Sequence, residues 1–562
     1  MKKLLFLLAL ALLASAAPLA KAKDEAPSAH QPVVVAAFSG YAELKRDLGY
    51  LGTLSGNPDM AKGLEQLLML FTQNQGLAGL DQSRPWGAAL SIGDNGDYPA
   101  MVFLPVDDLQ KLLDALAAVV GESVDAGDEI FEIKRNANTF FIKQQGEWAF
   151  VAQDKSVLDE LPGDPLELLG GLQEQYDLAV SANIQNVPQS MRDMAGFLIK
   201  SGMEQNLQNS DPDDEQAQLK QQLARKQVDQ LIESINDLDK ITLGVSIDAE
   251  NHHSIFDIGV SGVPGSDLAR QLSESTADGG ASKVAGFLLP GSLLSLHLNS
   301  AVSKRDLEQT EAGLASLRTQ IMQQIESDED LEDAQAKAKV KQLVGKTLDI
   351  LEKTLKKGQV NLGASVVGEG PLTIVAGVLV ADAPELEKVV KEFIKLAGDD
   401  PNVPKAKLNA AEYKGIKFHT VSLPLSNDTS NVEKIGELFG DPLDVALGFG
   451  PDRVYLAAGK GGIDTLKKAI DRSATAPATG LPPMKLSLAL APLMKLAASQ
   501  QGGNPQAEML AQQLKQSGKD HVNVTVEPLD NGVRYRIEAE EGINKLLGAA
   551  LGTAISGGAG GF

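Results

Sequence analysis

The segment from Gly87 to Gly121 most constrains the fold, because its pattern recurs along the chain. In its second part, apolar residues follow the spacing of one face of an α-helix; they are Leu109, Leu112, Leu113, Leu116 and Val120. Asp107 and Gln110 suit a capping box in front of this helix, and Gly121 suits its end. The segment therefore predicts an amphipathic helix that buries its apolar face.

Similar patterns occur in three other places. Residues 362–398 repeat the apolar face at a constant offset, with Leu386, Val389, Val390 and Phe393 in place of Leu109, Leu112, Leu113 and Leu116. Residues 241–255 match residues 360–374 in the same way, and a fourth copy begins at Val522 with a turn at Asp530-Asn531-Gly532. Each copy alternates apolar and polar residues on both sides of a turn, which predicts a β-hairpin followed by a helix.

The four copies define two similar halves. A strand and a helical stretch precede each copy, and a further unit of strands and a helix follows only the first and third copies. We therefore expect halves at residues 31–276 and 288–552, joined by a linker at 277–287 and followed by a Gly-rich tail at 553–562. We expect each half to fold on its own.

These modules predict the fold class, since none can bury a sheet face alone. We expect an α+β protein in which duplicated strand-helix-hairpin-helix modules form largely antiparallel sheets with helices packed on one face.

Residues 1–22 have the features of a secretory signal peptide. Lys2 and Lys3 precede an apolar run and a stretch of small residues. A retained membrane anchor is the alternative, but the apolar run is too short to span a bilayer easily. The sequence therefore predicts export to the periplasm or the extracellular space, and no later apolar run predicts a transmembrane segment in the mature chain.

Composition narrows the chemistry further. The chain has no cysteine, which excludes disulfides, thiolate metal sites and the acylated cysteine of a bacterial lipoprotein. Its net charge of −24 repels phosphate backbones, so nucleic acid is not an expected partner. The alternative interpretation is that the negative charge mainly makes the protein soluble, and this role requires no binding partner.

No motif predicts a catalytic, cofactor-binding or metal-binding residue, and no cofactor is expected. His252 and His253 are adjacent in a predicted hairpin and would face opposite sides, so they are poor joint metal ligands. Trp86 and Trp148 stand at strand starts and could stack on sugars, but core positions are favoured. Acidic stretches that follow Ser210 and Ser327 could bind cations, although complementing a helix dipole is the favoured interpretation.

Taken together, the signal peptide, the lack of cysteine, the acidic balance and the repeated modules resemble the uncharacterised secreted bacterial proteins built from tandem α+β repeats, of the domain-of-unknown-function type. The resemblance implies no activity and no functional residue. It is consistent with an exported, non-enzymatic protein that binds or scaffolds, whose partner is an unknown protein or an apolar ligand held between sheet and helices. The alternative is a secreted hydrolase with paired carboxylates at the interface of the two halves.

Overall fold

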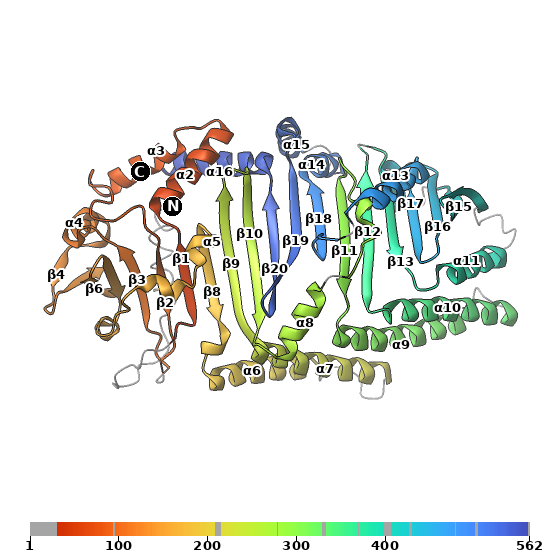
Figure 1. The fold of residues 1–562 in the computed structure, drawn as a ribbon, viewed down its shortest axis with the longest axis horizontal. Helices are drawn as coiled ribbons and strands as arrows, with labels where there is room; N and C mark the ends of the chain where they lie inside the picture. The colour runs from red at the N-terminus through yellow and green to blue at the C-terminus, as the bar shows by residue number, and fades with distance from the viewer. Residues whose placement is uncertain are drawn as a thin grey trace. The chain divides into compact units, whose positions relative to one another are not determined.

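The computed structural model describes residues 31–559, apart from 94–95, 136–137, 208–214, 278, 329–332, 369, 398–405, 426–429, 478 and 501–503. Contacts divide the chain into unit 1, which is Met1–Arg270 with Leu529–Phe562, and unit 2, which is Gln271–Pro528. Each unit combines helices with antiparallel strands (Figure 1). The predicted α+β class and the largely antiparallel pairing are confirmed.

Unit 1 contains a continuous series of antiparallel pairs. In order across the sheet, its strands are β4 (Ser123–Asp125), β5 (Ile130–Arg135), β6 (Asn138–Gln145), β7 (Trp148–Ala152), β3 (Ala100–Pro105), β2 (Trp86–Leu90), β1 (Val34–Phe38), β8 (Leu178–Asn183), β9 (Leu238–Asp248), β10 (His253–Gly262) and β20 (Gly532–Ala539). Its helices are α2 (Tyr41–Ser55), α3 (Met60–Phe71), α4 (Leu109–Val120), α5 (Leu172–Gln175), α6 (Gln189–Leu207), α7 (Glu215–Asp237) and α16 (Glu541–Ala559), with the short 3-10 helices η1 (Lys155–Leu158), η2 (Pro165–Leu169) and η3 (Ile184–Asn186).

Unit 2 contains a second such series. In order across the sheet, its strands are β14 (Lys407–Tyr413), β15 (Ile416–Leu423), β16 (Leu443–Phe449), β17 (Arg453–Ala458), β13 (Thr373–Leu379), β12 (Gln359–Val367), β11 (Leu294–Ala301), β18 (Met484–Ala489) and β19 (His521–Leu529). Its helices are η4 (Ala285–Phe287), α9 (Lys304–Ser327), α10 (Ala334–Leu355), α11 (Ala383–Ala397), α12 (Ser430–Phe439), α13 (Gly462–Thr475), α14 (Leu490–Gln500) and α15 (Pro505–Ser517). The division between the units falls within α8 (Asp267–Thr276).

The C-terminal segment 529–562 groups with unit 1. Strand β20 pairs with β10 from Ser254 opposite Ala539 to Ser261 opposite Gly532. Helix α16 lies beside α2 and α3 (Figure 1), and Ile555 belongs to their apolar cluster. Independent folding of the expected halves 31–276 and 288–552 stays a prediction.

Helix α4 forms where the apolar spacing predicts it, from Leu109 to Val120, and Gly121 follows with a positive φ of 104°. The predicted cap is wrong by one residue. Asp108 is the N-cap, and its side chain accepts the Lys111 N–H at 3.1 Å. The N–H of Asp107 instead donates to the carbonyl oxygen of Gly79 at 2.9 Å, which holds the chain before the helix begins.

Helices cover both faces of the sheets, so the expectation that they pack on one face is wrong here. In unit 2, α13 and η4 pack against Val375 and Tyr455, whereas α10 and α11 pack against Val378 and Val454. These two pairs of residues alternate along β13 and β17, and alternate side chains point to opposite faces of a sheet. In unit 1, α4 covers one face of β7, and η1, η2 and α5 supply Leu158, Leu169 and Leu172 to the other.

The expected linker at 277–287 contributes to the core of unit 2. Val284 and Phe287 are fully buried. Gly363 and Gly377 are paired across β12 and β13, and a Cβ at either would come within 3.0 Å of Phe287. The two glycines therefore leave the space that the Phe287 side chain fills.

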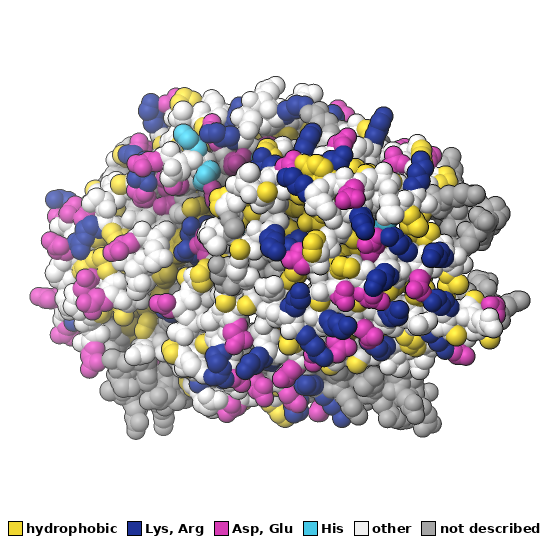
Figure 2. Space-filling model, turned by 45° about the vertical axis from the view of Figure 1, so that its right-hand side comes forward, with side chains coloured by type: hydrophobic (Ala, Val, Ile, Leu, Met, Phe, Trp, Pro, Cys, Tyr) yellow, Lys and Arg dark blue, Asp and Glu magenta, His cyan; other side chains and the backbone are white. Residues whose placement is uncertain are grey.

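The surface carries charges of both signs. Figure 2 shows acidic and basic side chains interspersed over the face that it draws. Ion pairs join the long helices of unit 2, for example Lys339 with Glu392 at 2.5 Å and Arg318 with Asp349 at 2.6 Å. Among the described helices, none combines the length and the apolar character needed to cross a bilayer.

Candidate functional site

An apolar cavity of ≈ 80 Å³ lies between α4 and the sheet of unit 1. The apolar face of α4 forms one side, and side chains of β3, β5, β6 and β7 form the other, including Ile133, Phe140 and Ile142. The residues that predict α4 from the sequence are thus the residues that line this cavity. Its size limits what it can hold, since a cavity of about 150 Å³ holds benzene and drug-sized ligands need about 300 Å³ or more. The cavity can therefore hold only the end of an alkyl chain or a short alkyl branch.

Arg135 is the charged residue in the cavity lining. It ends β5 and is exposed. No acidic side chain in the described part of the chain forms an ion pair with it. A guanidinium beside an apolar opening offers planar, paired donors to a carboxylate or a phosphate.

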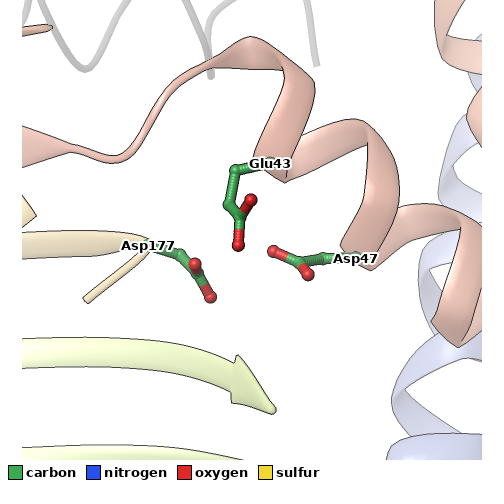
Figure 3. A group of neighbouring side chains, drawn as sticks. All are labelled: Glu43, Asp47 and Asp177. Carbon is green, nitrogen blue, oxygen red and sulfur yellow. The ribbon is translucent and has the colours of Figure 1, made fainter. Parts of the chain in front are cut away.

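Three carboxylates meet elsewhere in unit 1, and we call Glu43, Asp47 and Asp177 the acid cluster (Figure 3). Glu43 and Asp47 are four residues apart on α2, so they share one helix face. Asp177 directly precedes β8, which pairs with β1, and the carbonyl oxygen of Asp177 accepts the Ser39 N–H at 3.0 Å just before α2. One ligand oxygen from each carboxylate lies within 4.8 Å of the others.

Few donors satisfy the acid cluster. Arg46 forms ion pairs with Glu43 and, at 3.7 Å, with Asp47. The Ile247 N–H donates to Asp177 at 2.6 Å. Asp47 is only 2% exposed, and within the described part of the chain its Oδ1 atom has no hydrogen-bond partner.

The electrostatics of the acid cluster follow from this shortage. Burial is the main reason that the pKa of Asp47 rises to about 7; the Asp177 charge adds to the rise and Arg46 opposes it. Burial also raises the pKa of Asp177, and the Ile247 N–H counteracts that rise. At neutral pH the cluster can therefore hold a proton between Asp47 and Asp177, or replace that proton with another cation.

A buried ion pair between Asp257 and Arg536 is bonded to Tyr176, the residue that precedes Asp177. Asp257 is 1% exposed and accepts two hydrogen bonds from Arg536, at 2.9 and 2.7 Å. It accepts a third from the Tyr176 hydroxyl at 3.0 Å, and Arg534 lies 3.9 Å away. A Cβ on Gly244 would approach the Tyr176 ring to 2.5 Å, so this glycine lets Tyr176 cross β9 to reach Asp257. Because protein groups satisfy the buried carboxylate of Asp257, we interpret this network as structural.

The described histidines do not form one site. Among the described histidines, His253 pairs with Glu538 at 2.5 Å, while His252 lies in the turn and stacks on Tyr50. His419 in β15 lies 3.2 Å from Glu387. His297 in β11 is fully buried, 2.8 Å from the Ser282 hydroxyl, and burial lowers its pKa. His521 begins β19, and His30 lies outside the described residues.

The other residues weighed from the sequence are structural or undescribed. Trp86 begins β2 and Trp148 begins β7, and Trp148 is buried against Phe103. The acidic stretches after Ser210 and Ser327 fall largely outside the described residues. At the end of the stretch after Ser327, Asp333 caps α10, because its side chain accepts hydrogen bonds from the N–H groups of Gln335 and Ala336. This agrees with the interpretation that the acidic residues stabilise the start of a helix.

Comparison with known proteins identifies no relative: no family model, curated protein or solved structure matches the chain.

Sequence reasoning missed the acid cluster. Glu43 and Asp47 show helical spacing, but this is common among exposed acids. Asp177 lies far along the chain, and no local motif links it to α2. The informative sign was the position of a charged residue on the apolar side of α2, where Asp47 is followed by the buried Leu48 and Leu51.

Proposed function

We propose that the chain is an exported, non-enzymatic protein of the periplasm or the extracellular space that binds the apolar end of an amphiphilic ligand beneath α4. The observation that carries this proposal is the apolar cavity of ≈ 80 Å³ between α4 and the sheet, with Arg135 in its lining. Burying apolar surface supplies affinity without a reactive group. Export rests on residues 1–22, which lie outside the described residues.

The ligand proposed here has a short alkyl end and an anionic head. The alkyl end matches the volume and the apolar lining of the cavity, and the head group matches the guanidinium of Arg135. The rest of a longer ligand would stay outside the cavity. Octanoate is a suitable probe, and 1-octanol, which has the same chain without a charge, is its control.

We also propose that the repeated sequence modules reflect duplication of the sheet. The pairings support this, because β1 pairs with β2 and β8 in unit 1, and β11 pairs with β12 and β18 in unit 2. The further unit of strands joins at equivalent strands, through β7 to β3 and through β17 to β13. Helix α11 would then correspond to α4. The cavity would belong to unit 1 alone, because in unit 2 Leu343 and Ile350 of α10 pack against α11.

Calorimetric titration of the full chain with octanoate and 1-octanol tests the ligand proposal. We expect octanoate to bind more tightly than 1-octanol, and Arg135→Gln to remove this difference. Lys134→Gln is the matched control, because Lys134 is the neighbouring exposed cation and pairs with Glu132. Leu116→Phe should fill the cavity and abolish binding of both probes. Octanoate binding that is absent, or that persists unchanged in Leu116→Phe, would refute the proposal.

The hydrolase alternative stays a hypothesis. It requires a carboxylate pair at the interface of the two halves, whereas Glu43, Asp47 and Asp177 all belong to unit 1. Nothing in the described part of the chain favours a hydrolase over a binding protein.

A further inference from the structure

Unit 1 contains two buried aspartates, and their surroundings differ. Asp257 is 1% exposed and receives three hydrogen bonds, two of them from Arg536. Asp47 is 2% exposed, yet its Oδ1 atom has no hydrogen-bond partner among the described residues, and its nearest cation is Arg46 at 3.7 Å. Burying a carboxylate without partners is costly. The described residues therefore satisfy Asp257 but leave the Oδ1 atom of Asp47 without a hydrogen bond.

The neighbours of Asp47 increase this imbalance. Figure 3 shows the Asp47 carboxylate directed toward those of Glu43 and Asp177. The charged group facing them from α2 is Arg46, and β9 contributes the uncharged Ile247 N–H. When all three acids are ionised, one guanidinium faces three carboxylates, so the described charges do not balance. A second cation at the centre of the acid cluster would restore the balance.

We infer that Glu43, Asp47 and Asp177 form a binding site for a hard divalent cation of the Ca²⁺ class. All three ligands are carboxylate oxygens, which hard cations prefer. Ca²⁺ takes its oxygen ligands at about 2.3–2.6 Å, so oxygens on opposite sides of one ion are about 5 Å apart. The mutual distances of up to 4.8 Å in the acid cluster suit one such ion, with water completing its coordination.

The positions of the three ligands give the site a structural role. Glu43 and Asp47 belong to α2, whereas Asp177 precedes β8, the strand that pairs with β1. A bound ion would join the start of α2 to the edge of the central strands of unit 1. Burial raises the pKa of Asp47 to about 7, so a bound cation would have to displace a proton from this carboxyl near neutral pH.

Calorimetric titration of the full chain with CaCl₂ tests the inference, after chelator treatment and at constant ionic strength. We expect one Ca²⁺ per chain, and because Asp47 loses a proton on binding, the measured heat should depend on the ionisation enthalpy of the buffer. Asp47→Asn keeps the shape of the side chain and should weaken binding by about tenfold or more. Asp177→Asn should weaken it similarly.

The matched control is Glu174→Gln, which removes an exposed carboxylate three residues before Asp177 and should leave Ca²⁺ binding unchanged. Wild-type protein that binds neither Ca²⁺ nor Mg²⁺ would overturn the inference, whether or not the variants fold. Binding that Glu174→Gln weakens as much as Asp47→Asn would also overturn it, because that result indicates diffuse attraction to an acidic surface. Octanoate binding is a separate measurement and distinguishes failure of this inference from failure of the proposed function.

Discussion

Removing Arg536 should strongly destabilise unit 1, although the residue lies in β20, close to the C-terminus. Arg536 donates two hydrogen bonds to Asp257, and the exchange Arg536→Ala would leave that buried carboxylate with the Tyr176 hydroxyl at 3.0 Å and Arg534 at 3.9 Å. Breaking a buried ion pair from one side typically costs about 3–5 kcal/mol. Because two partners remain, we expect a loss near the lower end, about 3 kcal/mol.

The contribution of the Tyr176 hydroxyl to the stability of unit 1 can be measured too. Tyr176→Phe removes one hydrogen bond to a charged acceptor, which typically contributes about 1.5–3 kcal/mol. Combining it with Arg536→Ala should produce a non-additive loss, because both side chains bond to the same carboxylate. The control is Arg270→Ala, whose ion pair with Asp267 is exposed and should contribute at most about 1 kcal/mol.

Urea unfolding followed by tryptophan fluorescence is the suitable assay, since both tryptophans, Trp86 and Trp148, lie in unit 1. It separates unit 1 from unit 2, which need not unfold in the same transition. A loss below about 0.5 kcal/mol for Arg536→Ala is what an ordinary surface substitution gives. That result would refute both the buried ion pair and the placement of β20 in unit 1.

Other predictions concern the helix, a histidine and the fragment boundaries. Leu113→Ala, at a buried position lining the cavity, should cost about 2–5 kcal/mol by tryptophan fluorescence, whereas Lys111→Ala should cost at most about 0.5 kcal/mol; a harmless Leu113→Ala contradicts the assigned packing. Val390, expected from the sequence to be equivalent, is only half-buried, so its Ala variant should cost less in a circular dichroism melt. Because burial lowers the pKa of His297 below 6.5, the unfolded state takes up the proton first, and unit 2 should lose stability as the pH falls below about 6.5; His297→Gln should reduce that slope, and equal slopes would exclude the effect. The first half without residues 529–562 should show poor hydrogen-exchange protection in β10, and adding the segment should restore it; full protection without it would show that β20 is dispensable.

The parts of the fold that local pattern determines could be predicted from the sequence. Helix α4 follows from its apolar spacing, and the turn at Asp530-Asn531-Gly532 follows from its residue types, with Asn531 at a positive φ of 56°. The N-cap was misplaced because Asp107 and Asp108 are chemically alike. In the structure the N–H groups of both residues donate to the carbonyl oxygen of Gly79, which lies far upstream, and only the Asp108 side chain accepts the Lys111 N–H.

The candidate sites depend on contacts between distant segments, which pattern does not encode. The sequence identifies the α4 face as buried, but the volume left beneath it depends on how Phe140 and Ile142 pack from β6. Asp47 and Asp177 approach only because β8 pairs with β1. The covering of both sheet faces escaped prediction for the same reason, since α13 shows an apolar stripe but not which face of the sheet it covers.

The return of the C-terminal segment to unit 1 also sets an order of folding. A ribosome completes β10, which ends at Gly262, long before it makes β20, which begins at Gly532. Pairings so distant in sequence are slow to form, and an unpaired strand edge is prone to aggregation until they do. Synthesis therefore finishes all of unit 2 while the first-made part of the chain still lacks an edge strand. A stop codon just after Pro528 would remove β20 and α16, and so would damage the first unit although it was synthesised first.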